Sequence, residues 1–318
     1  MKNKILETLK SSDGYISGEA ISHTLGISRA AVWKHIKKLK SEGYEIASLT
    51  NKGYRLMNAP TAISPSAVDM LLKTKYIARN IIYTDRTGST NEEAKRLSSS
   101  PDGTLFISDH QTDGKGRLGR AWSSPSGTGI FMSLLLKPYI SPSDVSAITL
   151  IAGLAVCRAI GAGAKIKWPN DVVIGTRKVC GILTEMSAEI DRIGYVVCGI
   201  GINANNISFP DELRGKATSV FIETGSAVSR TELIASVMNE FEPLYEKFLK
   251  SGFEPISEQY RRLCVTIGRD IRVIFRGNEI TGTAVDINKN GGLIVKTEND
   301  TITVTSGEVS VRGIYGYI

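Results

Sequence analysis

The sequence lacks the features that mark exported and membrane-bound proteins. Its first residues, MKNKILETLKSSDG, contain no apolar run and no small-residue cleavage site, and no later segment offers about 18 uninterrupted apolar residues. These absences predict a cytoplasmic protein without a membrane partner. The cysteines are far apart and form no CxxC motif, so we expect four reduced packing residues: Cys157, Cys180, Cys198 and Cys264.

Histidine is also scarce, with three residues in 318. His23 and His35 fall in expected helices, where packing or a phosphate contact fits them better than metal ligation, and His110 lies far away in sequence. We therefore expect no metal site in the protein. The sequence also offers no Ser-His-Asp or Cys-His set, which argues against a reaction that needs an enzyme nucleophile.

The charge is unevenly distributed along the chain. Hydrophobic residues make up 42% and charged residues 22%, a globular balance, and a length of 318 residues predicts two or three domains. Residues 1–58 hold ten Lys/Arg against five Asp/Glu, which leaves +5 there and +2 for the rest of the total of +7. A small basic unit fused to a nearly neutral large one predicts a polyanionic partner for the small unit.

The basic unit has the pattern of a winged helix-turn-helix domain, which we assign to residues 1–60. Apolar residues at helical spacing predict a helix over 2–10, and further helices begin after Ser17 and after Ser28, with Gly26 as the turn between them. Two strands, at 44–49 and 54–56, then flank a turn with Lys52 at its tip, which is typical of a wing.

The third expected helix carries cations on the face opposite its apolar residues, where they suit phosphates and guanine edges in a major groove. The predicted DNA contacts are Ser17, Ser28, Arg29, Lys34, Lys37, Lys38 and Lys52. A solvated basic helix on an interaction module is the alternative, but the glycine turn, caps, hairpin and charge together favour DNA. The segment 57–61, with Pro65 soon after, marks the domain boundary.

The remaining sequence predicts a central domain over 61–267 and a C-terminal domain over 268–318, and the fold class is α+β. The central domain has expected strands at 105–109, 130–136 and 196–200 and expected helices at 91–97, 145–160 and 231–249, which predicts a mainly mixed sheet covered by helices. The C-terminal domain has expected strands at 271–275, 280–286, 292–296 and 301–305, which predicts an SH3-like β-barrel.

A glycine-rich loop, GKGRLGR over 114–120, follows the first of the central strands. It matches GxGxxG, but turn formers follow it instead of a helix, which argues against a dinucleotide-binding fingerprint. Its cations and backbone N–H groups instead suit a lid that closes over the phosphate of a nucleotide. An ordinary exposed basic loop is the alternative, although it would not need three glycines in six residues.

Two further segments are polar where a plain strand would not be. KWPND, from Lys167, interrupts an apolar run, and RKVCGILTE, from Arg177, predicts a strand with Lys178 at its entrance. A cation at a strand end that faces a cleft can stabilise charge on a transferring phosphoryl group. A surface lysine with an extended stem is the alternative for Lys178.

Five segments occur in the order found in biotin protein ligases, so the chain resembles that family over nearly its whole length. They are GSTN from Gly88, GKGRLGRAW from Gly114, KWPND, RKVCGILTE and GIGIN from Gly199. With the winged helix in front, the sequence is similar to the bifunctional form, which is both a biotin ligase and a repressor of the biotin operon.

The resemblance implies roles for individual residues. Biotin would be held by Ser89, Thr90, Asn91, Gln111, Lys115, Gly116, Arg117 and Lys178. ATP and the adenylate would be held by Gly114, Arg117, Arg120, Trp122, Lys167, Asn170 and Asn203. Lys178 and Arg117 would be the catalytic pair. The family often has arginine at the second loop position, where this chain has Lys115, and this departure leaves open whether the side chain makes a bidentate phosphate contact.

The resemblance also implies a reaction and its partners. Biotin and ATP, with Mg²⁺, would form biotinyl-5'-AMP, and a lysine of a biotin carboxyl carrier protein would then take the biotinyl group. Biotinyl-5'-AMP would also favour a homodimer that binds operator DNA of biotin genes. A ligand-sensing regulator without chemistry and a lipoate ligase are the alternatives, and pyrophosphate release with ATP and either biotin or lipoate separates them.

Overall fold

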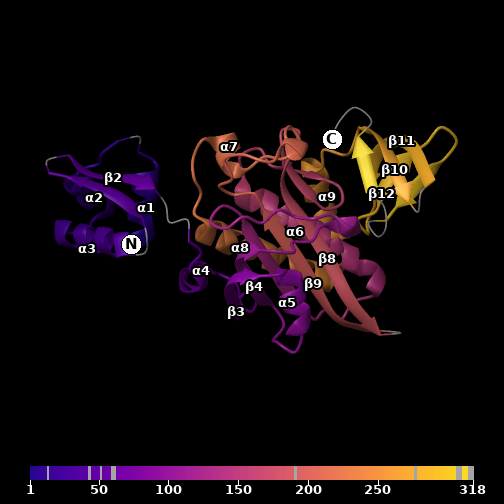
Figure 1. The fold of residues 1–318 in the computed structure, drawn as a ribbon, viewed down its shortest axis with the longest axis horizontal. Helices are drawn as coiled ribbons and strands as arrows, with labels where there is room; N and C mark the ends of the chain where they lie inside the picture. The colour runs from indigo at the N-terminus through magenta and orange to yellow at the C-terminus, as the bar shows by residue number, and fades with distance from the viewer. Residues whose placement is uncertain are drawn as a thin grey trace. The chain divides into compact units, whose positions relative to one another are not determined.

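The computed structural model describes residues 1–12, 14–41, 44–50, 52–58, 62–189, 192–275, 278–305 and 310–313. Within it the chain forms two compact units, shown in Figure 1. The first comprises residues 1–63 with 227–230, and the second comprises 64–226 with 231–318. Most of the predicted boundary segment, residues 59–61, lies outside the described residues. The division at 267/268 stays a prediction, because the C-terminal strands belong to the second unit.

The first unit contains the predicted helix-turn-helix. Its helices are α1 (Lys2–Lys10), α2 (Gly18–Leu25) and α3 (Arg29–Ser41). The Ser17 hydroxyl accepts the Ala20 N–H at 3.0 Å at the start of α2, and the Ser28 hydroxyl accepts the Ala31 N–H at 3.2 Å at the start of α3. Gly26, with φ of 64°, ends α2 in the left-handed conformation that glycine adopts without strain.

A two-stranded wing completes the first unit. Strands β1 (Glu45–Leu49) and β2 (Gly53–Asn58) pair antiparallel, and Ile16 adds a bridge to Tyr54. Gly53 is required there, because its φ is 100° and a Cβ atom would lie 2.0 Å from the Ile16 carbonyl oxygen. The core beneath the wing is apolar: Ile5, Leu6, Leu9, Ile21, Val32, Ile36, Leu39, Tyr44 and Ile46.

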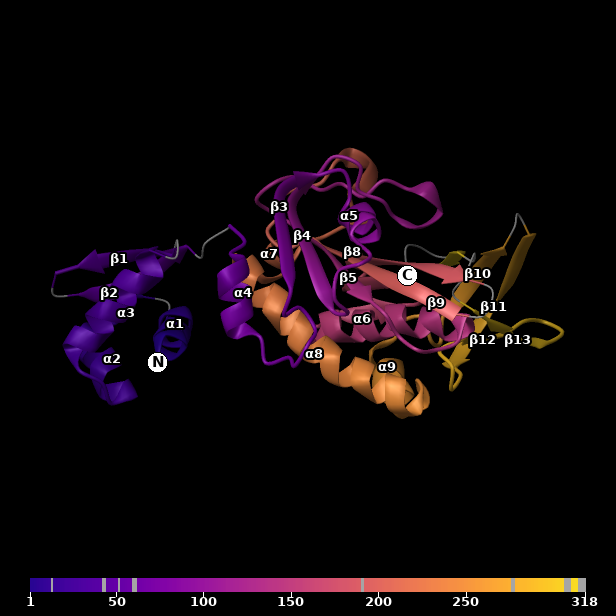
Figure 2. The ribbon, with the colours of Figure 1, turned by 90° about the horizontal axis from the view of Figure 1, so that it is seen from below.

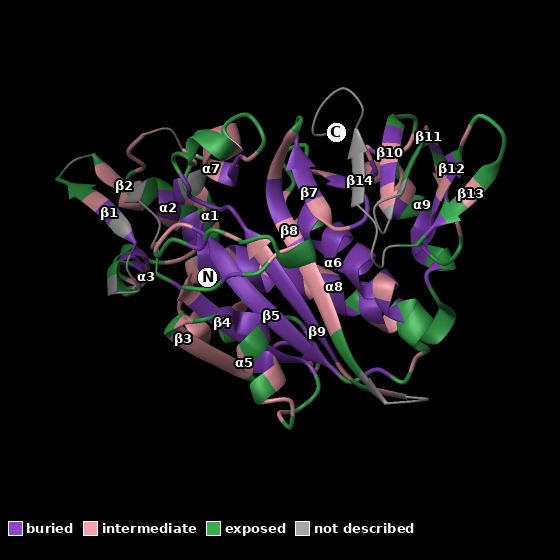
Figure 3. Cartoon of the chain, turned by 45° about the vertical axis from the view of Figure 1, so that its right-hand side comes forward, coloured by how far each residue is buried: buried purple, intermediate pink, exposed green. Residues whose placement is uncertain are grey.

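The second unit is built on a seven-stranded mixed sheet with the order β3-β4-β5-β9-β8-β7-β6. Its strands are β3 (Ile81–Thr87), β4 (Thr104–Gln111), β5 (Ile130–Leu136), β6 (Lys165–Lys167), β7 (Asp171–Ile174), β8 (Arg177–Glu189) and β9 (Arg192–Ile202). Only β3 and β4 pair parallel among the neighbours in this sheet. Every residue of β5 is buried, so this strand forms the centre of the core (Figure 3).

Helices cover both faces of the sheet. They are α4 (Pro65–Leu71), α5 (Thr90–Arg96), α6 (Val145–Ile160), α7 (Val220–Thr224), α8 (Arg230–Ser251) and α9 (Glu254–Leu263), with single 3-10 turns η1 (Arg117–Gly119), η2 (Pro142–Asp144) and η3 (Asp211–Leu213). Figure 2 shows α5 on one side of the sheet and α6 with α8 on the other.

Helix α6, with the turn before it, is apolar and long enough to cross a membrane, as a 19-residue segment with a mean hydropathy of 1.6. Within the described residues it is the one segment that meets both criteria. It packs against β8, β9 and α9, and 67% of its most apolar window is buried. It is therefore a core helix of this domain, and its hydropathy reflects burial on all sides.

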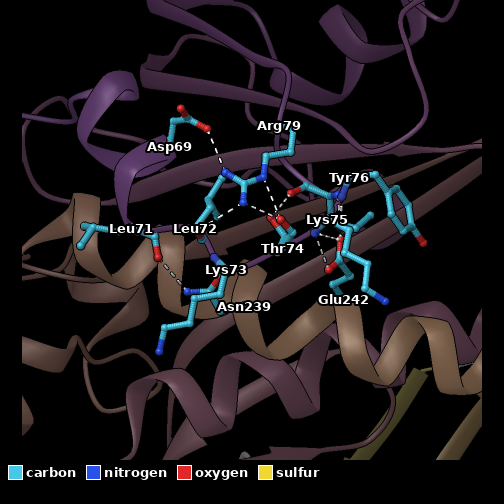
Figure 4. A network of polar contacts seen from close by, with 11 residues as sticks. Asp69, Leu71, Leu72, Lys73, Thr74, Lys75, Tyr76, Arg79, Asn239 and Glu242 are labelled. Atoms are coloured by element: carbon cyan, nitrogen blue, oxygen red, sulfur yellow. Dashed lines mark hydrogen bonds and ion pairs between the residues drawn. The ribbon is translucent and has the colours of Figure 1, made fainter.

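A polar clamp holds the segment between α4 and β3 on α8, as Figure 4 shows. Glu242 is 5% exposed, and its Oε1 accepts the backbone N–H groups of residues 75–77 at 2.9 to 3.0 Å. One turn earlier on α8, Asn239 accepts the Lys73 N–H at 2.6 Å. Arg79 donates to the Thr74 carbonyl at 2.8 Å from inside the same segment. The clamp satisfies buried backbone donors that no strand or helix pairs.

The C-terminal sheet is antiparallel and has the order β13-β12-β11-β10-β14. Its strands are β10 (Asp270–Phe275), β11 (Asn278–Ile287), β12 (Leu293–Lys296), β13 (Thr301–Val304) and β14 (Ser310–Gly313). Trp168 ties it to the central sheet, because its Nε1 donates to the Gly291 carbonyl at 3.0 Å. The sequence predicted four of these strands and missed β14. The predicted α+β class, with an SH3-like C-terminal domain, is confirmed.

All four cysteines are buried and free, as predicted. Burial raises the pKa of the Cys157 and Cys198 thiols to about 12, so both stay protonated near neutral pH. They are packing residues without nucleophilic character.

Candidate functional site

A concave pocket opens on the α5 side of the central sheet, and such concave sites are typical of small-molecule binding. It brings together the three polar segments that the sequence predicted to act jointly. Its lining residues are Ser89, Thr90, Asn91, Gln111, Lys115, Gly116, Arg117, Trp122, Phe131, Met132, Asn170, Lys178, Gly181, Ile182, Leu183, Gly199, Ile200 and Gly201. All eight residues predicted to hold biotin are in this set, and so are Trp122 and Asn170 from the predicted ATP set.

One end of the cavity is polar but neutral. Gln111 Oε1 accepts both the backbone N–H of Thr90 at 2.9 Å and its hydroxyl at 3.1 Å. The Ser133 hydroxyl lies 2.7 Å from Thr90 Oγ1 and 2.6 Å from Asn91 Oδ1. Within the described residues the Ser89 side chain makes no hydrogen bond, although Ser89 is buried. This end offers oriented hydroxyl and amide groups to a neutral polar ligand.

A second layer of charges orients the amide of Asn91. Its Nδ2 donates to Glu185 Oε2 at 2.7 Å, and the other oxygen of Glu185 pairs with Lys95 at 2.7 Å. Because the nitrogen is committed to a carboxylate, Asn91 turns its oxygen toward Ser133. Neither Glu185 nor Ser133 was predicted from the sequence.

The floor of the cavity is made of glycines on β8 and β9. Gly181 and Gly201 face each other across the two strands, and Gly199 faces Leu183. A Cβ atom would lie 2.6 Å from the Trp122 ring at Gly201 and 2.2 Å from Asn91 Oδ1 at Gly199. The absence of these side chains lets Trp122 and Asn91 approach the sheet. Glycine inside a strand pattern indicates such close approach, and the GIGIN segment contains two such glycines, Gly199 and Gly201.

The other end of the cavity, named the cationic end, holds Lys178 and Arg117. Lys178 Nζ lies 2.5 Å from Asp171 Oδ1 and 5.3 Å from the centre of the Trp122 ring. Arg117 donates to Asn170 Oδ1 at 3.0 Å. Burial lowers the pKa of Arg117, and the nearby Asp171 carboxylate raises it in part. Two cations beside one carboxylate favour an anionic ligand.

Buried beside this end, the indole Nε1 of Trp122 has no hydrogen-bond partner in the described part of the chain. A buried donor without a partner is rare in proteins, and a ligand that fills the cavity is one way to satisfy it.

The glycine-rich loop is closed by its own contacts. The Gly114 carbonyl accepts the Trp122 N–H at 2.8 Å, and the Gly116 N–H donates to the Arg120 carbonyl at 2.6 Å. Lys115 Nζ pairs with Glu92 Oε1 at 2.9 Å, and the same oxygen receives Lys95 at 3.1 Å. Hydrogen bonds from these two lysines lower the pKa of Glu92, and Glu92 raises the pKa of Lys115.

The KWPND segment forms the hairpin turn between β6 and β7, and its side chains contact three other parts of the second unit. Trp168 binds the C-terminal sheet, Asn170 binds Arg117 of the glycine-rich loop, and Asp171 pairs with Lys178. Asn170 also donates from Nδ2 to the Ile182 carbonyl at 3.1 Å. One turn therefore sets the position of both predicted catalytic cations.

Four residues of the predicted ATP set do not line this cavity. Gly114, the first residue of the loop, is buried, and Arg120 is exposed. Lys167 is 7% exposed at the end of β6. Asn203 is buried and donates to the Thr218 carbonyl at 3.0 Å, which ties β9 to the segment before α7.

The predicted DNA-binding residues of the first unit are all exposed, and the cations among them lie on α3 and on the wing turn. Ser17 and Ser28 cap α2 and α3, so their side chains contact backbone. The apolar side of α3 packs in the core of the unit, and its cations lie on the exposed side: Arg29, Lys34, Lys37 and Lys38.

Comparisons with known proteins agree with this geometry. A model of the biotin/lipoate A/B protein ligase family matches residues 81–203, an HTH domain model matches 2–55, and a biotin protein ligase C terminal domain model matches 266–312. The bifunctional ligase/repressor BirA of Bacillus subtilis (strain 168) is 39% identical over 305 residues, which cover 93% of this chain and 94% of the relative. The chain belongs to the bifunctional ligase/repressor BirA family.

More distant members of the BirA family cover the chain as well. BirA of Escherichia coli (strain K12) is 28% identical over 96% of both chains. Among solved structures, a biotin protein ligase from Aquifex aeolicus in complex with biotin and ATP superposes with a TM-score of 0.66 and 30% identity, over 74% of this chain and 99% of that one. The family resemblance predicted from the sequence is therefore confirmed.

Proposed function

We propose that this chain is a biotin protein ligase that also represses biotin synthesis genes. It activates biotin with ATP to biotinyl-5'-AMP and transfers the biotinyl group to a lysine of a biotin carboxyl carrier protein. One observation carries the proposal: a single cavity joins the neutral polar groups of Thr90 and Gln111, the Trp122 ring above a floor of glycines, and the cations Lys178 and Arg117. Biotin has matching groups: a neutral ureido ring, an aliphatic chain and a carboxylate.

In this assignment the neutral end binds the ureido ring. Ser89, Thr90, Asn91 and Gln111 supply its hydrogen bonds, and three of these side chains are already oriented by internal partners. Such preorganisation lowers the entropy lost when the ligand binds. Trp122 and the glycine floor border the aliphatic chain, and the carboxylate lies at the cationic end beside Lys178.

The first half-reaction needs positioning and charge stabilisation. A carboxylate oxygen of biotin attacks the α-phosphorus of ATP, and the bond to pyrophosphate breaks with its electron pair. Lys178 and Arg117 stabilise the negative charge on the α-phosphoryl oxygens, and Asp171 and Asn170 hold these two cations in place. Mg²⁺ bound to ATP would offset negative charge on the pyrophosphate leaving group.

The second half-reaction consumes the adenylate. The amine of the acceptor lysine attacks the carbonyl carbon of the mixed anhydride, AMP leaves, and the amine loses a proton as the amide forms. Arg117 lies in the glycine-rich loop and binds Asn170 in the turn between β6 and β7. We therefore expect Arg117 to retain the intermediate in the cavity until the acceptor arrives.

A direct test incubates the purified chain with ATP and either biotin or lipoate, and measures pyrophosphate release. Mass spectrometry of the protein then looks for bound biotinyl-5'-AMP. We expect pyrophosphate release and a bound adenylate with ATP and biotin, and neither with ATP and lipoate. Pyrophosphate release with lipoate but not biotin would assign the other ligase activity, and release with neither would leave a sensor without chemistry.

The repressor function requires coupling between the cavity and DNA binding. A helix-turn-helix protein usually needs a two-fold dimer to read an operator. We propose that biotinyl-5'-AMP, held under the glycine-rich loop, favours a homodimer in the cytoplasm when unmodified carrier protein is scarce. A tenfold tighter dimer needs about 1.4 kcal/mol of differential binding.

Sedimentation and operator binding without ligand, with biotin, and with biotin plus ATP test this coupling. We expect dimers and tight operator binding with biotin plus ATP. Equal behaviour in all three conditions would refute the coupling and leave the ligase function unaffected.

A further inference from the structure

The exposed face of α3 carries a tryptophan as well as cations. Trp33 is 57% exposed, and Lys37, one turn later, lies with its Nζ 5.2 Å from the centre of the indole ring. On the other side of the helix, Val32, Ile36 and Leu39 are buried in the core of the unit. Trp33 therefore lies on the exposed face of α3, opposite the face that packs in the core of the unit.

The surroundings of Trp33 indicate which kind of partner would cover it. Residues 30, 33, 34 and 37 share one face of the helix, at the spacing i, i+3, i+4 and i+7. Residue 30 is an alanine, so little side chain stands beside the indole at the start of the helix. The helix has one arginine, four lysines and no acidic residue, which favours a polyanion.

The placement on the second helix of a helix-turn-helix specifies the contact further. The N-terminal turns of this helix enter the major groove and meet base edges, while lysines and arginines also bind phosphates. An indole has one N–H donor and a large apolar surface, so it suits a base edge better than a phosphate. In the major groove the thymine C5 methyl group is the apolar feature that an aromatic side chain recognises.

We propose that Trp33 reads the operator sequence by contacting a thymine methyl group in the major groove, with Lys37 holding the ring in place. This inference rests on the proposed DNA-binding function and adds a residue that determines sequence specificity. The cations of α3 contribute affinity for any DNA, and Trp33 contributes discrimination between bases.

The test begins by selecting binding sequences for the full-length protein, with biotin and ATP, from a library of randomised DNA duplexes. Each thymine of the selected site is then replaced by uracil, which removes one methyl group and keeps the base pair. At one thymine per half-site we expect the wild-type protein to bind about fourfold to tenfold more weakly after the replacement.

The Trp33→Ala protein should bind the thymine and uracil sites equally, because the group that senses the methyl is gone. Lys34→Ala is the matched control from the same helix face: it should keep the thymine preference and lower the dependence of binding on salt by about one counterion. Ligase activity and thermal unfolding verify that both variants keep the fold.

Two results would overturn the inference. The first is a Trp33→Ala protein that keeps the full thymine preference; if this variant also shows altered dimer formation in sedimentation, the indole is assigned to contact with a second copy of the chain. The second is a wild-type protein that shows no thymine preference at any position. If the wild type enriched no sequence from the library, the DNA-binding function itself would fail.

Discussion

Removing the ammonium group of Lys178 tests the cationic end of the cavity directly. In Lys178→Ala, the stabilisation of the α-phosphoryl charge disappears. The carboxylate of Asp171 also loses the ammonium group that lies 2.5 Å from its Oδ1, so its negative charge repels the anionic substrates more strongly. Both changes raise the energy of the transition state. Two unit charges about 4 Å apart interact by about 4 kcal/mol at an effective dielectric constant near 20.

The expected loss follows from this arrangement. Removing one preorganised donor from a transition state costs about 2.7–4 kcal/mol, which corresponds to roughly a hundredfold to a thousandfold in rate. We expect Lys178→Ala to slow the formation of biotinyl-5'-AMP by this factor. The double variant Lys178→Ala/Asp171→Asn should recover about tenfold of it, because about 1.4 kcal/mol of repulsion between the Asp171 carboxylate and the anionic substrates is removed.

Pyrophosphate release in a single turnover, with saturating biotin and ATP, measures the chemical step. Lys73→Ala is the control, since Lys73 is an exposed lysine in the same unit but outside the cavity. Thermal unfolding checks that each variant is folded. Adenylate formation at the wild-type rate in folded Lys178→Ala would refute the catalytic assignment, and a double variant slower than the single one would refute the role given to Asp171.

Three further predictions concern the loop, the floor and the clamp. Arg117→Gly should let biotinyl-5'-AMP escape, so that albumin becomes biotinylated on blots, whereas strict specificity for the carrier protein would exclude retention by Arg117. Gly201→Ala places a Cβ atom 2.6 Å from the Trp122 ring, so we expect a shift in tryptophan fluorescence and about tenfold weaker substrate binding by calorimetry. Unchanged fluorescence and unchanged binding would contradict the close packing of Trp122 on Gly201. Glu242→Gln should lower the free energy of unfolding by about 2 kcal/mol in urea titrations. The control Glu246→Gln, which affects only a solvent-accessible ion pair with Lys75, should change it little, and equal effects of the two would disprove the clamp.

Local patterns predicted much of the fold. The caps at Ser17 and Ser28 and the turn at Gly26 act within a few residues, so the sequence placed α2 and α3 correctly. The apolar run at 145–160 predicted a helix with the same ends as α6, Val145 and Ile160. Strand β14 was missed, because its four residues carry no periodic pattern and depend on pairing with β10.

The site was predictable as a set of segments but not as a set of contacts. The segments around Asn91, Arg117 and Lys178 were expected to cooperate, and all three line one cavity. The partners that orient them come from strand register, which no local pattern specifies. Glu185 reaches Asn91 only because β8 pairs with β9, one of the strands on which α5 packs. Asp171 reaches Lys178 across a β-bulge between β7 and β8.

The turn between β6 and β7 has a consequence for how this protein family can vary. Residues 168–170 link two paired strands, and Lys167 lies directly opposite Asp171. The length of a hairpin turn sets the register of its strands, and a slip of one residue turns every following side chain to the other face. An inserted or deleted residue would therefore move Asp171 away from Lys178 and disturb the anchor at Trp168 in the same event. The turn should tolerate exchange of individual side chains far better than any change in its length.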